Sequence, residues 1–153
     1  MWLWIAIHLM AATFWVGGMY FAHRCLRPAA EVHLEAPQRL LLWRGVLRRF
    51  FSRLWTAIAA LLISGYLMVF IYLGGLGAVS LHVHLMQLSG ILMVLLYLYV
   101  YFEPYRRLKS ALDDGDYEAA AGHLARVRRV VGVNIILGVL TMLLGATGRY
   151  WTL

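Results

Sequence analysis

The sequence predicts an all-α fold, an integral membrane four-helix bundle. The 153-residue chain is 63% hydrophobic and only 14% charged, whereas soluble domains average about 45–50% apolar and about 25% charged residues. The apolar residues also gather into uncharged runs that are long enough to cross about 30 Å of hydrocarbon as helices. With 3 prolines, 1 cysteine and no short glycine period, the composition argues against a disordered, collagen-like or disulfide-held chain.

Three uncharged runs define the helices in chain order. Residues 2–22 are interpreted as a membrane helix and not as a secretory signal, because no basic residue precedes them and no small-residue cleavage site follows. Residues 54–102 are about two spans long and are interrupted by Gly-Gly-Leu-Gly at 74–77. The third run covers residues 130–148. The predicted helices are therefore 2–22, 54–73, 80–102 and 130–148, within a single transmembrane domain of residues 1–153.

The segments between these helices carry nearly all of the positive charge. Thirteen of the 14 basic residues lie in two long loops, predicted at about 23–53 and 103–129, and none lies at 74–79. The positive-inside rule then predicts cytoplasmic loops and outside termini, in the periplasm of a bacterial-type inner membrane. We expect the net charge of +7 to contact the anionic lipids of the bilayer, and we expect no nucleic-acid partner.

Local signals predict short structured pieces inside the two loops. Residues 43–51 mix basic with large apolar side chains, as an interfacial lead-in to the second helix would. Residues 113–118 predict a turn and an N-cap that open a short helix ending at Arg129. Pro104 is expected to close the third helix, because the residue before a proline disfavours helical geometry.

Polar residues inside a membrane are costly, so they are the candidates for function. At about 100° per residue, His8, Trp15 and Met19 share one face of the first helix. The third helix aligns His82, Met86, Ser89, Met93 and Tyr97, and the fourth aligns Asn134, Gly138, Thr141, Gly145 and Gly148. Small residues let helices pack closely or leave room for a flat ligand, and both interpretations stay open.

Three histidines, His8, His82 and His84, are predicted to lie in the outer leaflet on two helices that could face each other. The side chains of His82 and His84 point about 200° apart on a helix, so the choice between them stays open. Facing histidines with a slot between helices suit haem b. The predicted haem site comprises His8, His82, His84, Trp15, Thr141, Gly145 and Arg149, with Arg149 near a propionate.

Copper is the alternative ligand, because it accepts imidazole together with soft thioether sulfur. The predicted copper ligands are His8, His82, His84, Met10 and Met86. The remaining histidines, His23, His33 and His123, are expected to be solvated or interfacial.

Short motifs in all four predicted helices resemble the CopD-type membrane proteins. They are His8-Leu9-Met10 and Phe14 to Gly18, Ile63-Ser64-Gly65-Tyr66, Leu81-His82-Val83-His84-Leu85, and Arg126 to Arg129 leading into Val133 to Gly138. The resemblance implies copper resistance or uptake across the inner membrane. CopD-type proteins are similar in turn to HemJ, a haem-binding protoporphyrinogen IX oxidase, in which His8 would be the haem ligand. His82 and Val83 match the HemJ motif His-Val-Lys, but His84 replaces its lysine, which weakens that enzymatic assignment.

Three functions remain open from the sequence. The first is a haem b protein for electron transfer or a membrane oxidoreductase, which would need quinone, another redox protein or a second haem at His23. The second is a copper-handling protein of the CopD type, and the third is an accessory subunit of a larger complex; a homo-oligomer is also open. No Asp or Glu lies in the predicted spans, so a carboxylate proton relay is not expected. The lone Cys25 is expected to be incidental.

Overall fold

The computed structural model describes residues 1–151, without the side chain of Arg149. It is built from helices, and no strand occurs in this part of the chain. The α-helices are α1 (Trp2–Phe21), α2 (Arg27–His33), α3 (Ala36–Leu67), α4 (Leu81–Phe102), α5 (Pro104–Asp113) and α6 (Tyr117–Thr147). Two π-helical turns, η1 (Ala22–Leu26) and η2 (Met68–Tyr72), continue α1 and α3, and a 3₁₀ turn, η3 (Gly148–Tyr150), follows α6.

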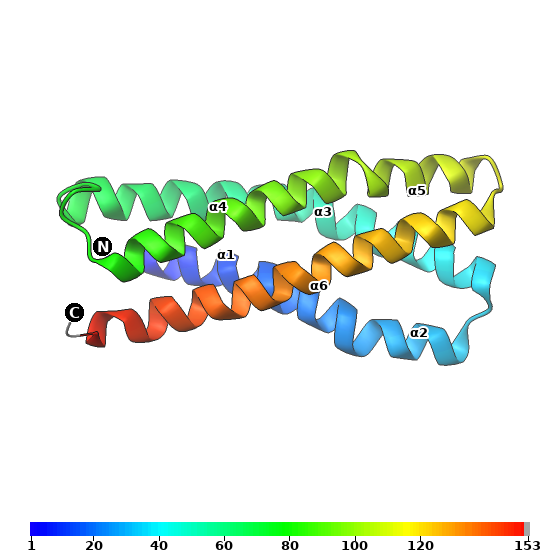
Figure 1. The fold of residues 1–153 in the computed structure, drawn as a ribbon, viewed down its shortest axis with the longest axis horizontal. Helices are drawn as coiled ribbons and strands as arrows, with labels where there is room; N and C mark the ends of the chain where they lie inside the picture. Colours follow the sequence, from blue (N-terminus) through cyan, green and yellow to red (C-terminus); the bar gives the residue numbers. More distant parts are fainter. Residues whose placement is uncertain (152–153) are drawn as a thin grey trace.

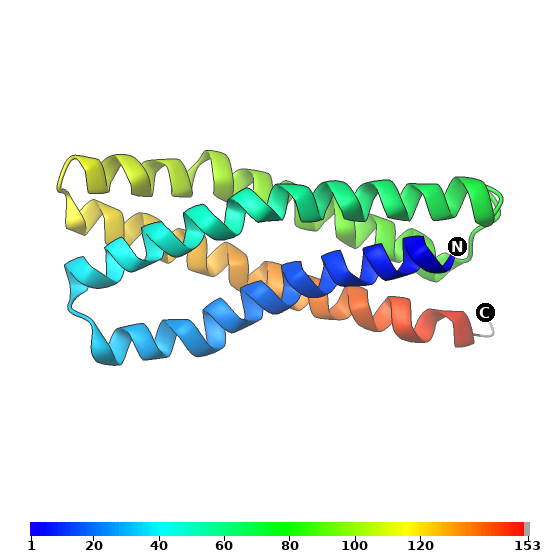
Figure 2. The same cartoon turned by 180° about the vertical axis from the view of Figure 1, so that it is seen from behind.

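Four long rods lie lengthwise in the molecule: α1 with α2, α3, α4 with α5, and α6 (Figures 1 and 2). Both termini and the 73–80 turn lie at one end, which we call the termini end. The turns at 34–35 and 114–116 lie at the other, the arginine-rich end, toward which both basic segments lie. The fold class is confirmed, because four helices are long and apolar enough to cross a membrane: Trp2–His33, Ala36–Tyr72, Leu81–Asp113 and Tyr117–Thr147.

The two predicted long loops are wrong, because the chain there is helical. Helix α3 has 32 residues, which corresponds to about 48 Å at 1.5 Å per residue, well beyond the 30 Å or so of hydrocarbon. Its basic first half buries a stripe at helical spacing: Leu40, Trp43, Leu47 and Phe51. Charged residues there mark where the helix leaves the apolar region and not where the helix ends.

Helix α6 shows the same extension on the other predicted loop. Its N-cap is Asp116, whose carboxylate accepts a hydrogen bond from the backbone N–H of Ala119 at 2.9 Å, as the N-cap signal predicts. The helix then runs without a break through Arg129 to Thr147, so the predicted short helix and the fourth span are one element. Pro104 acts as expected: α4 ends at Phe102, and the proline starts α5, where its missing N–H costs nothing.

The connection between α3 and α4 is the predicted glycine turn. Gly74 and Gly75 have φ angles of +80° and +89°, a left-handed region in which a side chain would be strained. The chain therefore reverses here in a few residues and returns α4 along the bundle.

Ion pairs and apolar packing hold the helical extensions together at the arginine-rich end. Leu108 of α5 is fully buried, and Glu103 pairs with Arg126 of α6 at 3.8 Å. Arg44 of α3 pairs with Asp113 of α5 at 2.6 Å. These contacts make the extensions a continuation of the bundle.

Candidate functional site

His8 lies against α3. Its Nδ1 is 3.0 Å from the hydroxyl of Ser64, and a Cβ at Gly65 would lie 3.2 Å from its Cε1. The Ser64 hydroxyl is itself directed to the carbonyls of Ala60 and Leu61, so it links the imidazole of His8 to the backbone of α3.

The predicted cost of an unpaired imidazole at His8 is therefore met by Ser64. Helix α1 packs mainly against α3 and α6, whereas α4 packs mainly against α6. The recorded contacts of His82 are with Ser80, Gly148 and Trp151. The structure thus pairs His8 with α3 and His82 with the end of α6, and within residues 1–151 no hydrogen bond or ring contact joins the two histidines.

The face of α4 that carries His82 and Met86 packs on the small residues of α6. A Cβ added at Gly145 would lie 2.9 Å from Cε and 3.4 Å from Sδ of Met86. Gly148 lies directly against His82, so that any side chain there would overlap it. One imidazole and one thioether, spaced i and i+4, therefore share the α4–α6 interface at the termini end.

The stripe of small residues on α6 is filled by neighbouring side chains. Gly138 faces Met93, with 3.1 Å between its added Cβ and Cε of Met93, and Thr141 donates to Ser89 at 2.7 Å. The stripe is therefore a close helix–helix contact of the kind that small residues permit. It does not form the flat slot predicted beside Thr141 and Gly145, and the haem hypothesis loses its geometric support.

Two other predicted metal ligands are turned outward. Met10 is 74% exposed and His84 is exposed on the face of α4 opposite His82. In a membrane such side chains face lipid, so they do not join His82 and Met86. The side chain of Arg149, predicted beside a propionate, lies outside the described residues.

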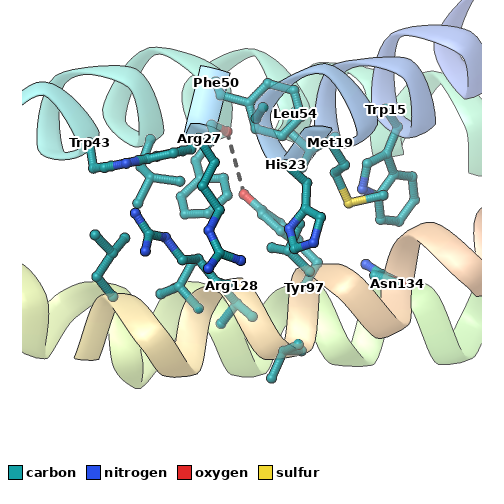
Figure 3. Close-up of a pocket in the computed structure, with 18 residues that line it drawn as sticks. Trp15, Met19, His23, Arg27, Trp43, Phe50, Leu54, Tyr97, Arg128 and Asn134 are labelled. Atoms are coloured by element: carbon teal, nitrogen blue, oxygen red, sulfur yellow. Dashed lines mark hydrogen bonds between the residues drawn. The ribbon is translucent and has the colours of Figure 1, made fainter. Parts of the chain in front are cut away.

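Trp15 lies away from the termini-end histidines, at a cavity in the arginine-rich half (Figure 3). The cavity has a volume of about 40 Å³, room for one or two waters. Met19 and His23 also line it, and Figure 3 shows both side chains directed into the space between α1 and α6. Helical periodicity predicts that Met19 shares the face of Trp15, but His23 is predicted from the sequence to be interfacial. The i and i+4 spacing of Met19 and His23 is the sequence signal that places their side chains side by side.

Asn134 is the polar residue at the α6 wall of this cavity. It is 3% exposed, its amide N–H donates to the carbonyl of Met93 at 3.3 Å, and its Oδ1 has no hydrogen-bond partner within residues 1–151. An amide oxygen directed into a membrane interior is costly unless a ligand or water reaches it.

The family described as copper resistance protein D matches residues 44–147. The chain belongs to the CopD family. The match runs from Arg44 in α3 through α4 and α5 to the end of α6, and α1, with His8 and Met19, lies before it. No curated protein and no solved structure matches the chain. Membership makes this a copper-related, multi-pass membrane protein. The matched family is CopD, and the similarity to HemJ is not shown.

For a CopD protein, the arrangement of imidazole and thioether groups is the relevant chemistry. Within the described residues no three His, Cys, Asp or Glu side chains gather into a metal site. Soft ligands instead follow one helix, since each contacts or faces α6: His82 at Gly148, Met86 at Gly145, Met93 at Gly138, Met19 at the Asn134 cavity and His23 at Gly132. We call these five side chains the soft-ligand series.

Proposed function

We propose that this CopD protein handles copper as a cargo, and that Cu(I) passes along α6 through the soft-ligand series. The observation that carries the proposal is the position of the series, which reaches from Gly132 within α6 to Gly148 at its C-cap. Those 16 residue steps correspond to about 24 Å, most of the hydrocarbon thickness.

The ligand chemistry favours Cu(I) over harder ions. Thioether sulfur selects Cu(I), and imidazole binds copper well. The series contains no carboxylate, which disfavours Mg²⁺ and Ca²⁺ because those ions require oxygen ligands.

A spread-out series suits transit more than storage. Conduction requires sites that attract an ion but release it to the next one. Pairs such as His82 with Met86, and Met19 with His23, offer two ligands each, which is fewer than the four of a closed structural metal site. The buried Oδ1 of Asn134 supplies a polar group at the cavity that Met19 and His23 line.

The proposal also includes an orientation in the membrane. The positive-inside rule supports an inner-membrane orientation with the arginine-rich end in the cytoplasm and the termini in the periplasm. In that orientation His82 and Met86 are the periplasmic pair, and Met19 and His23 are the cytoplasmic pair.

Cu(I) binding to the purified full-length protein tests the function. Titration against a colorimetric Cu(I) chelator, under reducing conditions, should give a site that weakens at least about tenfold in Met86→Leu, since even loss of an outer-shell partner costs about 10–100-fold in metal affinity. Leucine keeps the volume of methionine, so the fold should be retained.

Met10→Leu is the matched control, because Met10 lies at the same end of the bundle but is turned to lipid. It should bind Cu(I) like the wild type. Equal affinities of wild type, Met86→Leu and Met10→Leu would contradict the proposal, and the accessory-subunit hypothesis would take its place.

A further inference from the structure

A groove at the arginine-rich end gathers positive charge that the copper proposal does not use. It lies between α6 and the segment where η1 meets α2, and it is lined by His23, Arg27, Ala125, Arg128, Arg129 and Gly132. Three residues, His23, Arg27 and Arg128, also line the cavity of Figure 3, so the groove is continuous with it. The groove's three guanidinium groups attract anions, and of its lining residues only His23 belongs to the soft-ligand series.

Arg128 is the central residue of the groove. Its side chain is only 19% exposed, and its Nη1 pairs with Glu31 at 3.3 Å. Its guanidinium also lies over the ring of Trp43, at 5.3 Å from the centroid. Two contacts therefore fix the plane of this guanidinium.

The other edge of that guanidinium is unpartnered. Nε and Nη2 of Arg128 are buried and have no hydrogen-bond partner in the described chain. These two nitrogens lie on the same edge of the planar group, so they present two parallel N–H donors, the geometry that binds an oxyanion through two oxygens. The indole N–H of Trp43, at the cavity wall, is also buried and unpartnered in residues 1–151.

The charges around this edge leave a positive surplus. Glu31 is the single carboxylate paired there within the described residues, and it is shared between Arg27 at 2.9 Å and Arg128 at 3.3 Å. Arg129 lines the same groove and adds a third guanidinium. Buried donors without partners and uncompensated positive charge both call for an anion.

We propose that this groove is a phosphate-binding site, with the Nε–Nη2 edge of Arg128 as its main donor and Arg27, Arg129 and His23 around it. The phosphate comes from the headgroup of an anionic phospholipid or from free phosphate in the adjoining water. Arginine clusters at the end of a membrane helix bind both through the same oxygens. The site does not depend on the copper proposal, because His23 is the one residue that the two share and the arginines that would bind phosphate lie outside the soft-ligand series.

Two binding measurements on the full-length protein distinguish the sources. The first adds phosphatidylglycerol or phosphatidylcholine to delipidated protein in detergent and counts bound lipids by native mass spectrometry. The second measures radiolabelled inorganic phosphate by equilibrium dialysis. Retention of phosphatidylglycerol alone identifies the lipid headgroup as the ligand, and saturable phosphate binding identifies the free anion; either supports the site.

Variants assign the binding to the groove. Arg128→Gln should weaken the bound phosphate about tenfold, as loss of a bidentate charge-assisted contact does. Arg106→Gln is the matched control, because Arg106 is an exposed arginine at the same end but outside the groove, and it should leave binding unchanged.

Two further variants keep the test decisive if Arg128→Gln does not fold. Arg129→Gln should weaken binding, and Glu31→Gln, which removes the competing carboxylate, should strengthen it. The proposal is overturned if no saturable binding of either probe occurs, or if the variants of the groove that fold, among Arg128→Gln, Arg129→Gln and Glu31→Gln, all bind like the wild type.

Discussion

Ser64 gives His8 a hydrogen-bond partner within the apolar span of α1. The imidazole Nδ1 of His8 lies 3.0 Å from the Ser64 hydroxyl, and that hydroxyl donates to the backbone carbonyl of Leu61 at 3.2 Å. The depth and face of His8 could be predicted from the sequence, because both follow from helical periodicity. Its partner could not, because the rotation of α3 relative to α1 depends on packing along the whole interface.

The His8–Ser64 pair should be measurable as a coupling energy. A double-mutant cycle with His8→Ala and Ser64→Ala should give a coupling of about 0.6 kcal/mol, the average for hydrogen bonds between membrane helices. The free energy of unfolding in mixed micelles is the measurement. His8→Ala with Ser52→Ala is the control cycle, since Ser52 bonds only its own helix; a coupling there as large as for Ser64 would contradict the pairing.

Gly138 should be intolerant of even one methyl group. Its added Cβ would lie 2.6 Å from Cγ2 of Val16, and overpacking of this kind costs about 1–3 kcal/mol. We expect Gly138→Ala to lower the unfolding midpoint of the protein in detergent. Gly17→Ala is the matched control, because nothing lies within 4 Å of that position; if both variants were equally stable, the α6 stripe would not be a tight contact.

At the scale of elements, the helices are longer than the membrane they cross. The spans could be predicted because an uncharged run of about 20 residues has few alternatives to a membrane helix. The charged residues alone predict that each helix ends where the uncharged run ends, so they do not indicate the extensions. The apolar spacing of Leu40, Trp43 and Leu47, which are buried, was the signal that the helix continues.

Because these extensions are tightly packed, we expect a core substitution in them to lower the free energy of unfolding strongly, even though it lies far from the apolar spans. Leu108→Ala removes a side chain that is 0% exposed and should cost about 2–5 kcal/mol of unfolding free energy. Leu41→Ala, at a position that is 51% exposed, should change it by less than about 0.5 kcal/mol. Chemical denaturation of the two variants in the same detergent gives the comparison. Similar small losses for both would mean that the extensions are loosely packed.

At the scale of the molecule, the arginine distribution separates the two ends of the bundle. The sequence could predict this separation, because it predicts four spans with the basic residues in alternate connections. An even number of spans returns the chain to the end at which it began, as Figures 1 and 2 show. Which end faces the cytoplasm is a prediction of the positive-inside rule.

Accessible cysteines test that orientation. In a Cys25→Ser background, Asp114→Cys places a thiol in the turn at the arginine-rich end, and Gly77→Cys places one in the turn at the termini end. A membrane-impermeant maleimide should label Asp114→Cys in inverted vesicles and Gly77→Cys in right-side-out vesicles. The reverse labelling pattern would place the arginine-rich end in the periplasm and contradict the proposed orientation. Met19 and His23 would then be the periplasmic pair of the soft-ligand series.

The candidate site was only partly accessible to sequence reasoning. The shared face of His82, Met86 and Met93 follows from periodicity, and so does the small-residue stripe of α6. That these two faces pack on each other, instead of enclosing a ring, depends on how closely the backbones approach. The arginine-end cavity needed the structure, because α1, α3, α4 and α6 all contribute to it.

Cu(I) flux through the protein in liposomes tests the central claim most directly. Met93 lies in the middle of the soft-ligand series and is 4% exposed, so Met93→Leu removes a thioether from the path with little change in volume. Met142→Leu, on an exposed face of α6, is the matched control. We predict that a Cu(I) chelator trapped in the liposomes fills about tenfold more slowly with Met93→Leu, in keeping with the loss of one metal contact, and at the wild-type rate with Met142→Leu. Equal rates for the wild type and both variants would contradict passage of copper along α6.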